Sequence, residues 1–424
     1  MCDKAIDKPG DLAKNLGLDF LSFTKIQCML FEFGFYSSLL LIPFIHGIVY
    51  ALLLFWKGKA HQINANFWLG AFLILCSAYV APWMLGFAGW YDNQPYRDVL
   101  FYVPFQQLFW MGPLLYFYTQ SLLNPAFRLK PILLWHFAPG LLYNLGMLYL
   151  WVYDAFIYEG YYFYADQADK DFDPWYQYCG LASMVVYLIL SLRYYQSYKN
   201  FIYEQTSFAE KILFRWIKNY LIAFLVMLLL PVVFDVLGLF YPELKTYTGS
   251  WWFFLFFSLI TFYIGLSGYA NSVQTSIPFE LSVFDPKAME LETAETLLIE
   301  PEAQNNLAKE LDDALIWKAK IELLLAQEKL YENPELTLTE LAKKLQTNTS
   351  VVSKAINQGF EMNFNDLINH YRIEAVKEML RQNAHKKSTL LGIAYDCGFN
   401  SKATFNRAFK KNTGLSPKAY LETA

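Results

Sequence analysis

Long uncharged apolar stretches dominate the first two thirds of the chain. A helix needs about 20 mainly apolar residues to cross the hydrocarbon core of a bilayer, which is about 30 Å thick. Stretches of this length cover roughly residues 35–56, 67–89, 99–123, 131–153, 175–195, 217–241 and 249–271. Short polar segments separate them, a pattern that the core helices of a soluble protein do not require. The pattern therefore predicts a seven-span transmembrane domain in residues 1–272.

The polarity of the chain changes after residue 272. Residues 273–313 are acidic and interrupted by Pro278, Pro286 and Pro301, which is typical of a linker. From Ala314 the apolar positions recur at helical spacing, and the first helix, 314–331, is expected to end before Asn333 and Pro334. Residues 314–424 are therefore predicted to form a separate helical domain.

Two pairs of short helices are expected within this domain. In the first pair, a helix opening at Thr339 is followed by the polar turn 346–348 and by a second helix from about Thr349, with Asn348 as its N-cap. A long helix over 364–382 leads to the second pair, in which Gly398 supplies the turn and residues 401–411 form the second helix. Two short helices joined by a tight turn are a helix-turn-helix. The predicted fold class is all-α: a seven-helix transmembrane bundle followed by a cytoplasmic all-helical domain with two helix-turn-helix motifs.

The composition supports this division. Hydrophobic residues make up 55% of the 424 residues and charged residues 17%, whereas a soluble domain carries about 25% charged residues. Residues 1–272 have a net charge of −1, residues 273–313 of −8 and residues 314–424 of +5. The chain therefore has three parts of different character: an apolar body, an acidic connector and a basic C-terminal domain.

Other chemistry has little support in the sequence. The five cysteines are scattered, and the aspartates at 169, 171 and 173 lack the glycine and glutamate of a calcium loop. We expect no metal site and no cofactor. A P-loop, an H-E-x-x-H and a G-x-S-x-G motif are missing as well, which predicts that the protein is not an enzyme.

The segment GIAYDCGFNSKATFNRAFKKNTGLSPKAY carries a resemblance to a known family. Together with the residues from about Leu336 to Leu421, it resembles the DNA-binding domain of AraC/XylS-type transcriptional regulators. The preceding helix and YENPELTLTELA resemble the form fused to multi-pass membrane domains in Bacteroidetes-like bacteria. One position departs from the family, because Glu361 stands where a glycine is usual after the first recognition helix.

The resemblance implies a set of residues that contact double-stranded DNA. The first recognition helix would present Ser350, Val351, Ser353 and Lys354, and the second Lys402, Ala403, Asn406 and Arg407. Arginine and lysine suit guanine, asparagine suits adenine, and valine suits the thymine methyl group. Lys410 and Lys411 are expected to contact phosphates. For each residue a phosphate contact or simple exposure is the alternative.

Loop charges predict the orientation in the membrane. Basic residues follow the first and third stretches, at Lys57, Lys59, Arg128 and Lys130, and surround the segment between the fifth and the sixth. Such residues stay on the cytoplasmic side. We therefore expect a multi-pass protein of the bacterial cytoplasmic membrane, with the N-terminus outside and the DNA-binding domain in the cytoplasm.

Polar residues within the spans are candidates for a sensor of an unknown small-molecule or membrane signal. These are His46, His136 and Asp235, of which Asp235 follows Pro231 by about one turn. A structural hydrogen bond between helices is the alternative for each and is favoured for the histidines.

The sequence thus predicts a membrane-embedded, one-component transcription regulator, in which a homodimer is the simplest way to transmit the signal. Two alternatives stay open. The membrane domain can be a transporter or an enzyme with an appended regulatory domain, or the regulator can be dormant until proteolysis releases it.

Overall fold

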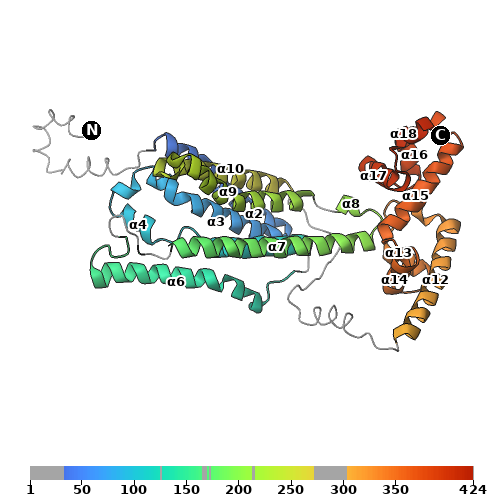
Figure 1. The fold of residues 1–424 in the computed structure, drawn as a ribbon, viewed down its shortest axis with the longest axis horizontal. Helices are drawn as coiled ribbons and strands as arrows, with labels where there is room; N and C mark the ends of the chain where they lie inside the picture. The colour runs from blue at the N-terminus through green and yellow to red at the C-terminus, as the bar shows by residue number, and fades with distance from the viewer. Residues whose placement is uncertain are drawn as a thin grey trace, which may run out of the picture. The chain divides into compact units, whose positions relative to one another are not determined.

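A computed structural model describes residues 33–124, 127–164, 170, 173–212, 215–271 and 303–423. Helices joined by turns and short irregular segments make up these ranges (Figure 1), with one isolated antiparallel bridge between Thr206 and Thr337, in agreement with the all-α prediction. The described residues form two compact units. The first contains most residues up to 191 together with 219–271, and the second contains residues 192–218 and 303–423 with a short piece at 123–127.

The first unit is built from long apolar helices. Their bounds are α2 Phe35–His61, α3 Asn64–Gly86, α4 Tyr96–Tyr102, α5 Leu108–Leu123, α6 Ala138–Val152, α7 Asp173–Gln205, α9 Arg215–Phe240 and α10 Tyr247–Ala270. Short 3-10 or π segments lie at Trp90–Asp92, Pro131–Phe137, Tyr153–Tyr158 and Pro242–Lys245. Six segments of the described chain are long and apolar enough to cross a membrane: α2, α3, Pro131–Tyr158, Trp175–Gln205, Trp216–Phe240 and α10.

The third predicted stretch, 99–123, differs from the prediction of one continuous helix. It is divided between α4 and α5, because the chain is extended at Val103, immediately before Pro104. The ring of a proline disfavours helical geometry in the residue that precedes it. The remaining helix α5 has 16 residues, about 24 Å at the rise of an α-helix, which is short of a typical hydrocarbon core.

Small residues allow α2 and α3 to pack closely. A Cβ atom on Gly47 would lie 2.2 Å from the Ser77 hydroxyl oxygen, and one on Gly70 would lie 2.5 Å from the ring of Phe55. Because glycine has no side chain at these positions, the backbones of the two helices can approach one another, as they do in helix pairs within lipid.

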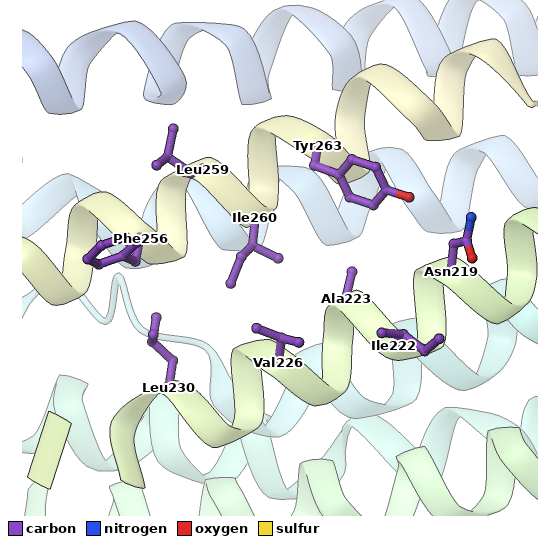
Figure 2. A pocket seen from close by; sticks show the side chains of 9 residues that line it. All are labelled: Asn219, Ile222, Ala223, Val226, Leu230, Phe256, Leu259, Ile260 and Tyr263. Atoms are coloured by element: carbon purple, nitrogen blue, oxygen red, sulfur yellow. The ribbon is translucent and has the colours of Figure 1, made fainter. Parts of the chain in front are cut away.

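An apolar groove of about 620 Å³ lies between α9 and α10. Figure 2 shows Val226 and Leu230 of α9 and Phe256 and Ile260 of α10 along it, with Asn219 and Tyr263 near one end. The candidate sensor residues His46, His136 and Asp235 are not among the residues that line this groove.

The second unit contains the long helix α12 and a set of shorter helices. These are α8 Ala209–Ile212, α12 Ala303–Glu328, α13 Leu338–Lys344, α14 Thr349–Gly359, α15 Phe364–Arg381, α16 Leu390–Asp396, α17 Lys402–Thr413 and α18 Pro417–Thr423, with 3-10 turns at Leu330–Glu332 and Ala384–Lys386. Helix α12 begins inside the predicted linker 273–313 and ends at Glu328, where Lys329 takes a positive φ of 46°. Residues 273–302 of the predicted linker, and Asp169 and Asp171, lie outside the described residues.

Two apolar cores stabilise these helices. One joins α12, α13, α14 and the start of α15 through residues such as Ile321, Leu341 and Ile356. The other joins the rest of α15 to α16 and α17 through residues such as Val376, Ile393 and Phe409. Helix α15 therefore contributes to both cores and connects the two helix pairs.

Candidate nucleic-acid interface

The first helix pair, α13 and α14, begins and ends where its polar residues predict. Thr337 and Glu340 form a capping box at the start of α13, in which the Glu340 amide donates to Thr337 Oγ1 at 3.2 Å. Asn348 caps α14 by accepting from the Val351 amide at 2.9 Å, which confirms the predicted N-cap. The inner face of α14 buries Val352 and Ile356 as expected.

The second helix pair, α16 and α17, has the same construction. Thr389 and Ser401 cap the two helices by accepting from the amides of Gly392 and Thr404, at 3.0 and 3.1 Å. The turn contains Gly398 at φ +91°, and a Cβ atom there would lie 2.3 Å from the Tyr331 carbonyl oxygen. Only glycine fits this turn, because both the positive φ and the close backbone exclude a side chain.

The face of α14 that is expected to contact DNA contains the four residues predicted from the family pattern. Ser350 and Lys354 are exposed, and Val351 and Ser353 are half-buried. Ser350, Ser353 and Lys354 line one shallow cavity together with Gln205. The structure therefore brings the polar members of this set together on one side of the helix.

The face of α17 that is expected to contact DNA is more basic. Lys402, Ala403, Asn406, Arg407, Lys410 and Lys411 are all exposed, while Phe405 and Phe409 are buried on the opposite side as expected. Two of the six make intramolecular ion pairs: Arg407 pairs with Glu210, and Lys411 Nζ lies 2.8 Å from Asp366 Oδ1. Lys402, Asn406 and Lys410 line a cavity beside α16 with Leu390 and Lys418.

Arg372 holds α15 to the segments around it. Its guanidinium is almost completely buried and donates to the carbonyl oxygens of Tyr331 at 2.8 Å, Asn333 at 2.7 Å and Ser207 at 3.3 Å. It also donates to Ser207 Oγ at 3.1 Å and Asn369 Oδ1 at 3.4 Å. Burial lowers the pKa of Arg372 to about 10, so the side chain stays charged at neutral pH.

Glu361 occupies the position where the resembled family usually has glycine. It takes a φ of +54°, just after α14 ends. This is the left-handed region that glycine enters without a steric penalty. The chain thus keeps the backbone conformation that a glycine would favour while it carries a side chain.

The candidate sensor residues have separate surroundings in the first unit. His46 stacks on Phe262 at a centroid distance of 3.7 Å, and neither of its ring nitrogens has a hydrogen-bond partner among the described residues. His136 Nδ1 lies 2.6 Å from the Tyr187 hydroxyl, a hydrogen bond to α7. Asp235 is exposed on α9. The structure does not bring these three residues together, and their role as sensors stays a prediction.

The sequence reasoning missed one part of this surface. Residues 206–210, which follow α7, lie in the second unit and contact α15 and α17, and Glu210 is the carboxylate that pairs with Arg407. The segment has no motif of its own, and Thr404 and Glu210 are 194 residues apart in the sequence. The basic residues around this segment predicted a cytoplasmic loop, and they did not predict its contact with α15 and α17.

Comparison with known proteins identifies the C-terminal fold. The family model described as "Helix-turn-helix domain" matches residues 341–423. Uncharacterized HTH-type transcriptional regulators of Staphylococcus aureus strains COL and MSSA476 are each 33% identical to the chain over 91 residues, which cover 22% of this chain and 12% of the relative. The chain therefore matches only a small part of the length of these relatives. No solved structure matches the chain.

The C-terminal part of the chain is a helix-turn-helix domain. The relatives that are similar to it over 91 residues are named as transcriptional regulators. Helices of membrane-spanning length precede it.

Proposed function

We propose that the protein is a membrane-embedded transcription regulator that binds promoter DNA through two recognition helices, α14 and α17. The single observation that carries the proposal is the basic, exposed face of α17 on a helix-turn-helix domain. Recognition helices of such domains enter the major groove, where exposed side chains near the helix N-terminus contact base edges.

The charge of the domain supports nucleic acid as the partner. Between residues 386 and 418 there are seven basic residues and one acidic residue, Asp396. Each phosphate that such residues neutralise releases counterions, so binding weakens steeply as the salt concentration rises. Two recognition helices on one chain allow a monomer to contact successive turns of the major groove, and a dimer would contact two such sites.

The first unit supports a location in the bacterial cytoplasmic membrane. Its apolar helices fit a multi-pass domain, and the distribution of lysine and arginine between the loops favours an external N-terminus and a cytoplasmic C-terminal domain. This orientation needs an odd number of crossings, so we count α5 as a seventh crossing beside the six longer segments. In this arrangement a signal perceived by the membrane domain regulates the DNA-binding domain in the same chain.

The base-reading role is tested by Asn406→Ala in the full-length protein in lipid nanodiscs, on a site first located by mapping genomic binding. Loss of an asparagine that contacts adenine lowers affinity for that site by about 1–3 kcal/mol, roughly 5- to 150-fold. The control is Gln327→Ala, because Gln327 is also an exposed amide but lies on α12. An Asn406→Ala affinity and footprint equal to those of the wild type would contradict the assignment.

The location is tested by attaching an impermeant label to single cysteines in intact cells. The proposal requires labelling near residue 93, between α3 and α4, and protection of a cysteine near residue 424. External labelling of the C-terminus would exclude contact with the chromosome. Transport of a solute by vesicles containing a chain that ends before residue 303 would instead favour a transporter with an appended regulatory domain.

A further inference from the structure

The segment that follows α7 is buried in the second unit. Thr206, Ser207 and Ala209 have exposed fractions of 1%, 0% and 0%. A connection between two helices usually lies on the surface, because its backbone groups need water or other partners. This connection instead finds its partners in the helix-turn-helix domain.

Four hydrogen bonds join the segment to the helix-turn-helix domain. The Ser207 amide donates to the Leu336 carbonyl oxygen at 3.1 Å, and Asn365 Nδ2 donates to the Thr206 carbonyl oxygen at 3.1 Å. The buried guanidinium of Arg372 donates to both the carbonyl and the hydroxyl oxygen of Ser207. Since these partners lie on or before α15, the segment is fixed against the element that connects the two helix pairs.

The anchored segment places Glu210 against the second recognition helix. Its carboxylate is 17% exposed, accepts from Thr404 Oγ1 at 2.8 Å and pairs with the guanidinium of Arg407. Thr404 and Arg407 are one turn apart on α17. Lys199 and Tyr203, from the end of α7, line the same polar cavity.

We propose that residues 206–210 are an autoinhibitory element, in which Glu210 occupies the hydrogen-bond donors of Arg407 that DNA would use. The proposal rests on the proposed DNA-binding function. A carboxylate and a DNA phosphate or guanine are acceptors for the same guanidinium, so the docked state and the DNA-bound state compete. The binding-competent state is the one in which the segment has left α17.

The connectivity of the chain makes this contact a route for regulation. The segment, whose last two residues begin the short helix α8, lies between α7 and α9, two of the helices of membrane-spanning length. A signal that favours one arrangement of these helices changes the fraction of molecules in which the segment is released. The apparent affinity for DNA is proportional to that fraction. The coupling is reciprocal, so DNA must also favour release.

The first test compares Glu210→Gln with the wild type and with Glu204→Gln, using full-length protein in nanodiscs and the specific DNA site. Glutamine keeps an oxygen that accepts from Thr404 but removes the charge that holds Arg407. Glu204 is on the last turn of α7, so its replacement removes the same charge from the same region. We expect Glu210→Gln to bind about 5- to 20-fold more tightly than either of the other proteins.

The outcomes separate this inference from the proposed function. Specific binding by all three proteins with equal affinity, or an equal gain from both substitutions, would overturn the autoinhibitory role and leave the regulator function standing. Failure of all three to prefer any DNA sequence would overturn both.

A second measurement does not depend on a variant. Hydrogen exchange of the wild-type peptide that contains Ser207 should accelerate at least about tenfold when specific DNA is saturating, because the Ser207 amide loses its bond to Leu336. Unchanged protection in the DNA complex would mean that the segment stays docked, which would overturn the proposal.

Discussion

The two units expose apolar side chains to very different extents. Helix α9 alone exposes ten large hydrophobic side chains: Ile222, Leu225, Val226, Leu229, Val232, Val233, Val236, Leu237, Leu239 and Phe240. Among the described residues from 315 onward there are five: Leu315, Ile316, Leu323, Tyr395 and Leu415. A soluble protein rarely exposes a large contiguous apolar patch. The difference indicates that the two surfaces are suited to different surroundings.

The interiors differ in a corresponding way. In the first unit, α2 and α3 approach each other at glycines such as Gly47 and Gly70. In the second, leucine, isoleucine and phenylalanine fill two cores around α15. Burial of apolar surface drives folding in water but gives little advantage in lipid, where close packing of backbones matters more. The core of the second unit also accommodates a charged group, Arg372, because main-chain oxygens surround it.

The largest expected effect comes from removing that charged group. Arg372→Met keeps much of the volume but leaves the carbonyl oxygens of Tyr331, Asn333 and Ser207 without their donor, which should cost about 3–5 kcal/mol. The measurement is the free energy of opening of the α15 amides by hydrogen exchange in the full chain. Arg381→Met is the control, because the exposed Arg381 pairs with nearby Glu378 and its replacement should cost less than about 1 kcal/mol. Equal protection in both variants would show that Arg372 does not stabilise the unit.

A carboxylate placed on each surface tests the contrast directly. Leu229, near the middle of α9, is 50% exposed, and Leu323 on α12 is 59% exposed. Leu229→Asp should oppose membrane insertion by about 3 kcal/mol if lipid surrounds α9, whereas Leu323→Asp should change stability by about 0.5 kcal/mol or less. Insertion is measured by the glycosylation of engineered acceptor sites on either side of the α9 segment. If Leu229→Asp inserts as efficiently as the wild type, α9 does not face hydrocarbon.

Glycine gives a smaller and more local test. Gly398→Ala places a Cβ atom against the Tyr331 carbonyl at positive φ and should destabilise the second helix pair by about 2 kcal/mol or more. Gly392→Ala, within α16, meets only the Thr389 hydroxyl at 3.2 Å and should be neutral or slightly stabilising, since alanine favours a helix by about 1 kcal/mol. The two unfolding midpoints, measured by hydrogen exchange under denaturant, should therefore move in different directions or by clearly different amounts. A common shift would remove the steric explanation.

Local signals explain which features could be predicted from the sequence. Asn348 and Ser401 cap their helices by accepting from amides three residues away, and Gly398 provides the positive φ that its turn needs. Short sequence patterns therefore determine where α14 and α17 begin. The break between α4 and α5 also has a local cause in Pro104, but the apolar character of 99–123 obscured it. The docking of Glu210 on Arg407 joins positions far apart in the sequence, and no short pattern specifies such a contact.

The smallest expected effect concerns the residue that departs from the resembled family. Glu361 adopts a φ of +54°, a conformation that costs a residue with a side chain about 1–2 kcal/mol more than glycine. Glu361→Gly should stabilise the first helix pair by about 0.5–1 kcal/mol, after the greater flexibility of glycine in the unfolded chain is subtracted. Glu335→Gly is the control, because this residue lies in a nearby turn without a positive φ and should not gain stability. If Glu361→Gly lowers the unfolding midpoint, the glutamate side chain stabilises the turn by more than its backbone conformation costs, and the steric argument for a glycine at this position fails.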